Sequence, residues 1–172
     1  MNNENYIVIN GKKTELTEEQ LKQLRIEVEP KKRHNPFGNF QDEHYYYINN
    51  ADEACLAENM GSVVNDIFYY NANHFNDEAF ARQVMLHQQL YRKLLKYAYD
   101  NNAQVTKKDW GWENDNPKYF IYCELYHNTF YVDSEAHTIT LGTVHFKDET
   151  VAEQAIKDVV EPFMKEHPEF VW

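Results

Sequence analysis

The sequence predicts an α+β protein in which two helices lie on one face of an antiparallel sheet, preceded by a small N-terminal strand–helix appendage. Strand-like segments rich in tyrosine alternate with amphipathic helical segments, and a short motif recurs at two expected strand-to-helix joints. Aromatic residues make up 15% of the 172 residues. Because each buried aromatic ring removes roughly 150–250 Å² from water, this content is enough to form a core. We therefore expect two hairpin-plus-helix units that share one sheet.

The N-terminal segment begins with a strand pattern that ends in an Asn-Gly turn. Thr17 and Gln20 have the spacing of a capping box, which predicts a short helix over about 18–26. Two prolines, a glycine and a basic cluster follow in residues 30–38, and this composition is typical of an exposed linker. The predicted organisation is an appendage and linker at 1–34 and an α+β domain at 35–172.

The first half of the domain contains strand-like segments at 45–48, 53–57 and 67–70, which predict a small meander. Asp77 is a suitable cap for a long helix that ends at about Asn102. An apolar stripe recurs along this helix at 3.6-residue spacing and predicts its buried face. The stripe consists of Phe80, Val84, His87, Tyr91, Leu94 and Ala98. The opposite face carries Arg82, Gln89, Lys93 and Lys96.

The second half follows the same order of elements. Strand-like segments at 119–123 and 128–132 flank a turn, and a longer strand pattern covers 138–146. Asp148 can then cap a second helix to about Val160. This order predicts a second hairpin followed by a second helix.

An internal repeat supports the two-unit interpretation. Residues 74–84 and 145–155 agree at six of eleven positions, as shown by HFNDEAFARQV and HFKDETVAEQA. The phenylalanine suits the last inward position of a strand, and the aspartate suits a helix cap. The shared alanine allows the helix to approach the sheet closely. The repeat therefore predicts two equivalent strand-to-helix joints, and the histidine before each joint is expected to make a turn hydrogen bond.

The net charge of -11 is unevenly distributed along the chain. Residues 41–76 contain six acidic residues and no lysine or arginine, and residues 103–172 contain thirteen acidic residues and six basic ones. Such a surface repels nucleic-acid phosphates and attracts basic partner surfaces. Acidity that serves only solubility is the alternative interpretation.

The sequence contains no motif that indicates catalysis or metal binding. A P-loop, a glycine-flanked serine, an HExxH pair and metal-like cysteine spacing are all missing from it. We therefore expect no enzyme activity, no cofactor and no metal. The two isolated cysteines, the first residues of the chain and the lack of an 18-residue apolar run predict a cytoplasmic protein that does not bind membranes.

A resemblance to a family adds to this interpretation. Asn35-Pro36-Phe37, the tyrosine-rich segment at 45–48, the first joint at 74–77 and the ending Glu161-Pro162-Phe163-Met164 are arranged as in small proteins of phages and prophages of gut Firmicutes. Leu90-Tyr91-Arg92-Lys93-Leu94-Leu95 also belongs to the similar region, which covers about 35–172. The resemblance implies a phage or mobile-element origin, and with it a location in the host bacterial cytoplasm. The threonine usual at the family's helix caps is aspartate in both joints of this chain.

Resemblance and charge together lead to a first hypothesis, an acidic inhibitor or decoy. Such a protein would mimic nucleic acid and bind a bacterial defence nuclease or nucleoprotein, as anti-CRISPR proteins do with Cas9-type effectors. The candidate partner-binding residues are Asp42, Glu43, Asp52, Glu53, Glu58, Asp66, Trp110, Trp112 and Glu113. The two tryptophans could anchor in a partner pocket, or they could fold back as a lid over the sheet edge.

The second hypothesis is a nucleic-acid-binding phage accessory protein that uses the basic N-terminus and the long helix. Its candidate residues are Lys31, Lys32, Arg33, Arg82, Arg92, Lys93 and Lys96. Their alternative role is a solvated helix face and a charged linker. The sequence leaves the oligomeric state open.

Overall fold

The computed structural model describes residues 6–9, 12–17, 19–20, 35–111, 113–127 and 129–171. The chain divides into two compact units, Met1–Asn35 and Pro36–Trp172. The mixture of helices with small antiparallel sheets confirms the predicted α+β class.

The first unit contains a hairpin formed by β1 (Tyr6–Ile9) and β2 (Lys12–Glu15). The predicted capping box is confirmed. The backbone N–H of Thr17 donates to Oε1 of Gln20 at 2.9 Å, and the backbone N–H of Gln20 donates to Oγ1 of Thr17 at 3.3 Å. The body of the predicted helix and the basic cluster of Lys31, Lys32 and Arg33 lie outside the described residues.

The second unit begins with an antiparallel hairpin formed by β3 (His44–Ile48) and β4 (Ala54–Glu58). Its turn is closed by Asn49, whose side-chain oxygen accepts hydrogen bonds from the backbone N–H groups of Ala51 and Glu53. This geometry is the asparagine turn that the polar residues between the strands favour.

The prediction of a third strand in the meander is wrong, because residues 67–70 belong to helix α2 (Val63–Tyr70). Ser62 caps this helix by accepting a hydrogen bond from the backbone N–H of Asn65. On its inner side the Phe68 ring stacks on Tyr47 at a centroid distance of 4.6 Å. Tertiary contacts and the cap therefore override the β propensity of this segment.

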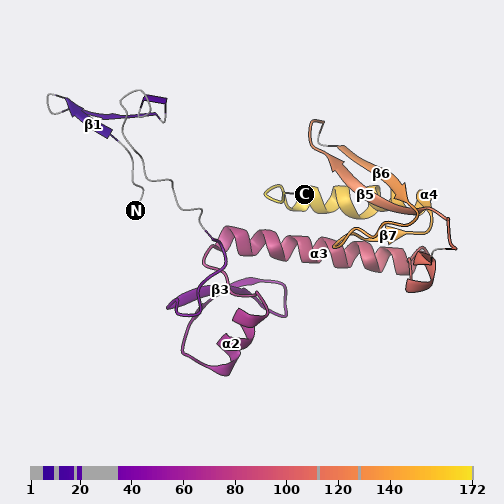
Figure 1. Cartoon of the computed structure of the whole chain (residues 1–172), viewed down its shortest axis with the longest axis horizontal. Helices are drawn as coiled ribbons and strands as arrows, with labels where there is room; N and C mark the ends of the chain where they lie inside the picture. Colours follow the sequence, from indigo (N-terminus) through magenta and orange to yellow (C-terminus); the bar gives the residue numbers. More distant parts are fainter. Residues whose placement is uncertain are drawn as a thin grey trace. The chain divides into compact units, whose positions relative to one another are not determined.

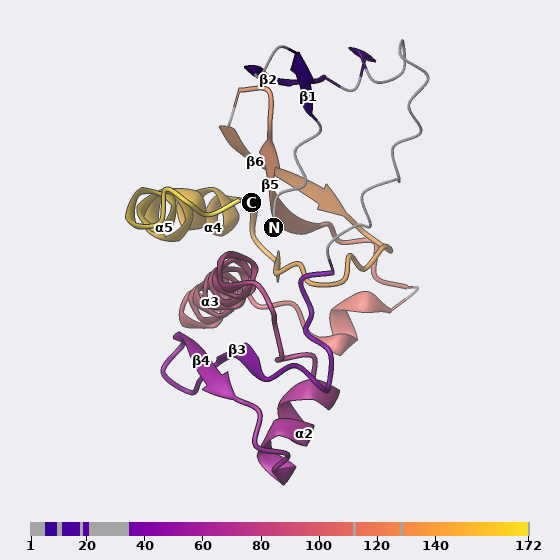
Figure 2. The same cartoon turned by 90° about the vertical axis from the view of Figure 1, so that its left-hand side faces the viewer.

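Helix α3 (Glu78–Asp100) runs through the middle of the second unit (Figure 1). The first hairpin and α2 lie on one side of α3, and the remaining sheet and helices lie on the other side (Figure 2). Its fully or nearly buried residues are Ala81, Met85, Leu86, Leu90, Leu94 and Ala98. The helix therefore separates two sets of strands rather than covering one sheet.

The predicted buried stripe of α3 is only partly right. Leu94 and Ala98 are buried, but Phe80 is half-buried and Tyr91 is 40% exposed. His87, predicted to lie in the core, is exposed. Small alanines let the neighbouring elements approach α3 closely, so the large rings on which the prediction relied lie at the edges of the buried face.

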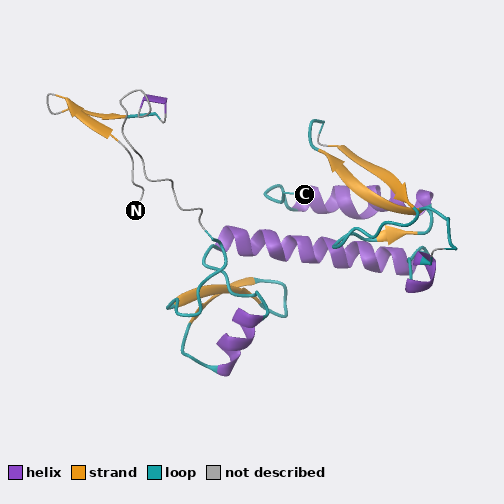
Figure 3. Ribbon diagram, viewed as in Figure 1, coloured by secondary structure: helices purple, strands orange, loops and turns teal. Residues whose placement is uncertain are grey.

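The second sheet has the strand order β6-β5-β7 and is antiparallel throughout (Figure 3). Its strands are β5 (Lys118–Glu124), β6 (Thr129–Glu135) and β7 (His145–Phe146). The prediction of one shared sheet is wrong for the described part of the chain, because the first hairpin forms a separate sheet across α3. The predicted strand over 138–146 is also too long, since only its last two residues pair.

The chain ends in a continuous helical stretch made of α4 (Glu149–Ala155), a π-helical turn η2 (Ile156–Val160) and α5 (Glu161–Glu166). It extends past the predicted end at Val160. Pro162 lacks the N–H that an α-helix needs at that position. At the same place the N–H of Glu161 bonds to the carbonyl of Ile156, five residues earlier.

The two joints predicted by the repeat both begin a helix, but only the second connects a strand to a helix, because Phe146 belongs to β7 whereas Phe75 forms an isolated bridge. Phe75 forms a bridge with Tyr46, and Phe146 pairs with Tyr119, so each phenylalanine is held against a hairpin strand. Asp77 and Asp148 each accept a hydrogen bond from the backbone N–H three residues later and begin α3 and α4. The repeat is therefore structural and not a coincidence of composition.

We predict that Leu86→Ala lowers the free energy of unfolding by about 2–5 kcal/mol, because Leu86 is 1% exposed and its removal leaves a cavity beside α3. Leu95→Ala is the matched control, because Leu95 lies on the same helix and is 37% exposed. Its cost should stay below about 1 kcal/mol. Urea denaturation of both variants measures the difference, and equal losses would show that the core lies on another face.

Candidate partner-binding surface

Helix α2 carries its apolar residues on the outside. Val63, Val64, Ile67 and Tyr70 follow one another on one helical face at spacings of one, three and three residues, and we call them the α2 face. All four are exposed, with Val63 at 74% and Tyr70 at 79%. Met60, in the loop before the helix, is also exposed. Contiguous exposed apolar residues of this kind mark interaction surfaces.

Polar contacts hold α2 in place in spite of this inverted pattern. Asn65 is its buried residue, and its side-chain amide donates to Oδ1 of Asn59 at 2.7 Å. The hydroxyl of Ser62 donates to Oδ1 of Asn65 at the same distance. These bonds connect the helix to the end of β4. The fold of α2 therefore does not require the α2 face to be covered.

A buried histidine lies beneath α2. His74 is 2% exposed, stacks on Tyr45 at a centroid distance of 4.1 Å and meets the edge of Tyr69 from α2 at 5.8 Å. Gly38 packs directly on the imidazole, since a Cβ at that position would lie 2.4 Å from Nδ1. Neither ring nitrogen has a hydrogen-bond partner in the described structure. The turn hydrogen bond expected for this histidine is therefore not formed.

The environment of His74 favours its neutral form. Burial lowers the pKa of His74, and the nearby carboxylate of Asp42 opposes this effect in part. The equivalent residue of the second joint, His145, lies within 2.8 Å of Oε1 of Glu135 through Nε2, so that ring does form a hydrogen bond. The histidines of the two joints thus occupy equivalent positions but differ in their hydrogen bonding.

We predict that acid destabilises the fold through His74. Because the folded-state pKa lies below the unfolded value of about 6.5, the unfolded chain binds the proton more tightly. The stability contributed by the neutral ring is present above about pH 6.5 and is lost as the pH falls towards the lowered pKa. His74→Phe keeps an aromatic ring on Tyr45, so its free energy of unfolding should fall less between pH 7 and pH 5.

Urea denaturation at a series of pH values measures this difference between the two proteins. The control is Leu56→Phe, since Leu56 is an exposed residue of the same hairpin and has no titratable group. It should keep the wild-type pH dependence. If the free energy of unfolding of His74→Phe depends on pH as it does in the wild type, His74 does not couple protonation to folding.

The predicted acidic residues of the first half gather at two ends of the hairpin. Glu43 and Glu58 are exposed at the end from which the chain enters α2. Asp52 and Glu53 lie at the opposite end, in the turn, where Asp52 forms a 2.6 Å ion pair with Arg92 of α3. Asp66 is half-buried on α2 itself. The structure therefore brings Glu43, Glu58 and Asp66 close to the α2 face, and it gives Asp52 a structural partner.

Asp42 contributes to the fold of the same end. Its carboxylate accepts a hydrogen bond of 2.6 Å from the backbone N–H of Asn39. It thereby holds the loop that places Gly38 on His74. No lysine or arginine occurs between Arg33 and Arg82, a stretch with eight acidic residues. The lysine, arginine, aspartate and glutamate side chains of the hairpin and α2 are therefore all acidic, and Arg92 of α3 pairs with Asp52 at the hairpin turn.

Trp110 folds back onto the second sheet. Its ring meets His145 edge to face at a centroid distance of 5.0 Å, and Nζ of Lys118 lies 5.2 Å from the ring. This arrangement agrees with the lid alternative, because Trp110 packs on residues of the second sheet. Glu113 is exposed in the following loop, and Trp112 lies outside the described residues.

Asp109 fixes the loop that carries Trp110. Hydrogen bonds from Thr106 lower the pKa of Asp109 to about 2, and an ion pair with Lys147 at 3.0 Å acts in the same direction. The carboxylate therefore stays charged over the ordinary pH range and stabilises the short helix η1 (Lys107–Trp110).

The four cations of α3 each have a partner. Arg82 pairs with Glu78 at 2.9 Å, Arg92 pairs with Asp52, and Lys96 pairs with Asp100. Lys93 lies over the ring of Phe163 at 5.7 Å. A nucleic-acid phosphate would have to compete with these contacts. The second hypothesis is left with the cluster at 31–33, which lies outside the described residues.

Other kinds of site have little support in the described part of the chain. No three His, Cys, Asp or Glu side chains there gather as metal ligands would. None of its helices combines the length and the apolar character needed to cross a membrane. Comparison with protein-family models, with curated proteins and with solved structures found no match.

The α2 face escaped sequence reasoning because valines and aromatic residues at 63–70 favour strands. The signal that could have found it is the capping pattern of Ser62 and Asn65, which marks a helix start. On a helix beginning there, Val63, Ile67 and Tyr70 fall on one face, and Asn65 falls on the other.

Proposed function

We propose that this protein is a non-catalytic binding protein that attaches to a basic surface of another protein through the α2 face and its acidic surroundings. The observation that carries the proposal is the exposed apolar face of α2 within a stretch that has eight acidic residues and no basic one. Apolar residues at the centre of an interface supply affinity, and charged residues at its rim supply orientation and speed of association.

The chemistry of this surface defines the partner. A complementary patch has an apolar centre and a rim of lysine and arginine, and the basic rim is a feature shared with surfaces that bind nucleic-acid backbones. Occupying such a patch would block nucleic acid, so the protein would act as an inhibitor or decoy. Its resemblance to phage proteins makes a bacterial defence nuclease or nucleoprotein, including a Cas9-type effector, the first partner to test.

A nucleic-acid-binding accessory protein is the second candidate function. The observation in its favour is the presence of Arg82, Arg92, Lys93 and Lys96 on one helix. Their existing contacts with acidic and aromatic side chains reduce what they can offer to phosphate. Direct binding of duplex DNA would distinguish this function from the first.

We predict that Ile67→Ala combined with Tyr70→Ala weakens binding to the protein partner by at least about tenfold, mainly through faster dissociation, because apolar anchors determine complex lifetime. Leu141→Ala is the matched control, since Leu141 is an exposed apolar residue of the second half. Its binding should match that of the wild type. Biosensor kinetics with immobilised defence complexes measure both variants.

We predict that Glu43→Gln combined with Glu58→Gln slows association and reduces its dependence on salt, because exposed charges act over about 8 Å at physiological ionic strength. Glu153→Gln is the control, because it removes one negative charge from an exposed position on α4. The kinetics are compared at two salt concentrations, with duplex DNA in a parallel channel. Tight, salt-sensitive binding to DNA without any protein partner would contradict the proposal in favour of the second function.

A further inference from the structure

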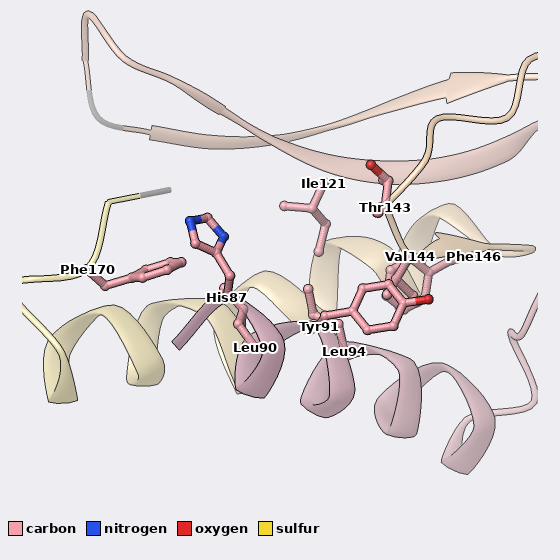
Figure 4. Close-up of a pocket in the computed structure, with 10 residues that line it drawn as sticks. His87, Leu90, Tyr91, Leu94, Ile121, Thr143, Val144, Phe146 and Phe170 are labelled. Atoms are coloured by element: carbon pink, nitrogen blue, oxygen red, sulfur yellow. The ribbon is translucent and has the colours of Figure 1, made fainter. Parts of the chain in front are cut away.

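A cavity of about 190 Å³ lies between α3 and the chain segment that leads into β7 (Figure 4). Side chains from four parts of the second unit line it. Leu90 and Leu94 come from α3, Ile121 from β5, Phe146 from β7 and Phe170 from the C-terminal segment. All five are buried core residues. Its walls are therefore fixed by the main core, on the side of α3 away from the first hairpin and α2.

Three groups give this cavity its polar character. His87, Tyr91 and Thr143 lie among the lining residues, and no Asp, Glu, Lys or Arg joins them in the described structure. The His87 ring meets Phe170 edge to face at a centroid distance of 4.7 Å, which fixes one side of the imidazole. A charged ligand would find no counter-ion here, so burying it would be unfavourable.

The chemistry of His87 suits a neutral ligand. His87 is exposed as a whole residue, but partial desolvation of its ring lowers its pKa, and a hydrogen bond involving the Val171 backbone opposes this in part. A neutral imidazole has one N–H donor and one acceptor nitrogen. It can therefore accept a hydrogen bond from an O–H or N–H group placed near the rim while the apolar walls enclose the rest of the molecule.

We infer that this cavity binds an uncharged molecule with one aromatic ring system and a single O–H or N–H donor, such as a phenol or an indole. An engineered apolar cavity of about 150 Å³ holds benzene, so the volume here fits a ligand with one aromatic ring system. The walls include two phenylalanine rings that favour edge-to-face contact with an aromatic ligand. This site is separate from the α2 face and does not depend on the proposed partner.

Ligand-observed saturation-transfer NMR on the full chain tests the inference with phenol, indole and benzoate as probes. We expect saturable binding of phenol and indole and none of benzoate, which has the same ring with a negative charge. Thr143→Phe should fill the cavity from its rim and weaken phenol binding at least about tenfold. Ile139→Phe, at an exposed position of the same loop, should bind like the wild type.

A second variant tests the hydrogen bond of His87 separately from the volume of the cavity. His87→Leu should weaken phenol binding about fivefold or more and leave toluene binding unchanged, because toluene has no donor for the imidazole. Amide NMR spectra show whether each variant remains folded. Equal binding of phenol to the wild type and to Thr143→Phe would overturn the inference, as would equal binding of benzoate and phenol.

Trp172 follows Val171 in the sequence and carries an indole, which is one of the probe chemistries. The same titrations are therefore repeated with Trp172→Ala. If phenol and indole bind only to that variant, the chain fills the cavity with its own side chain and the inference is overturned. Binding to both proteins with similar affinity supports a free ligand site.

Discussion

The arrangement of the second unit depends on one interaction that occurs twice, the packing of a buried phenylalanine between a hairpin strand and the first turn of a helix. Phe75 and Phe146 are at most 1% exposed, and each is bonded through its backbone to a strand. The aspartate two residues after each phenylalanine caps the helix that follows, so the helix begins there. Because Ala81 and Ala152 are fully buried one turn further on, each helix lies close to the element it covers.

The two joints have diverged in what surrounds them. Tyr45 and Lys118 occupy equivalent positions in the two joints, and both are buried. Each lies one residue before the strand residue that pairs with the phenylalanine of its joint. Tyr45 stacks on an unpaired His74, whereas Lys118 donates to two backbone carbonyls beside the Trp110 ring. The first joint is thus mainly aromatic, with the Asp42 carboxylate near its histidine, and the second contains charged groups with hydrogen-bond partners.

Local signals in the sequence predicted the local parts of this fold. The capping residues Asp77, Asp148 and Thr17, and the equivalence of the two joints, could be predicted because each depends on a few neighbouring residues. The helical state of 67–70 and the pairing of the hairpins depend on contacts distant in sequence, such as Phe68 on Tyr47. Of the candidate site, the acidic residues were visible in the sequence, but the α2 face was not, because its exposure depends on how α2 docks.

The way α2 docks also explains how an apolar surface can stay exposed. Ser62, Asn59 and Asn65 hold the helix through side-chain hydrogen bonds, and a pair of rings from Phe68 and Tyr47 completes the contact. Hydrogen bonds of this kind fix the orientation of α2, and they do so without burying its apolar side chains. The valines and Ile67 are therefore free of any role in the core, and their replacement should leave the fold intact. A change there that alters binding can accordingly be assigned to the surface itself rather than to unfolding.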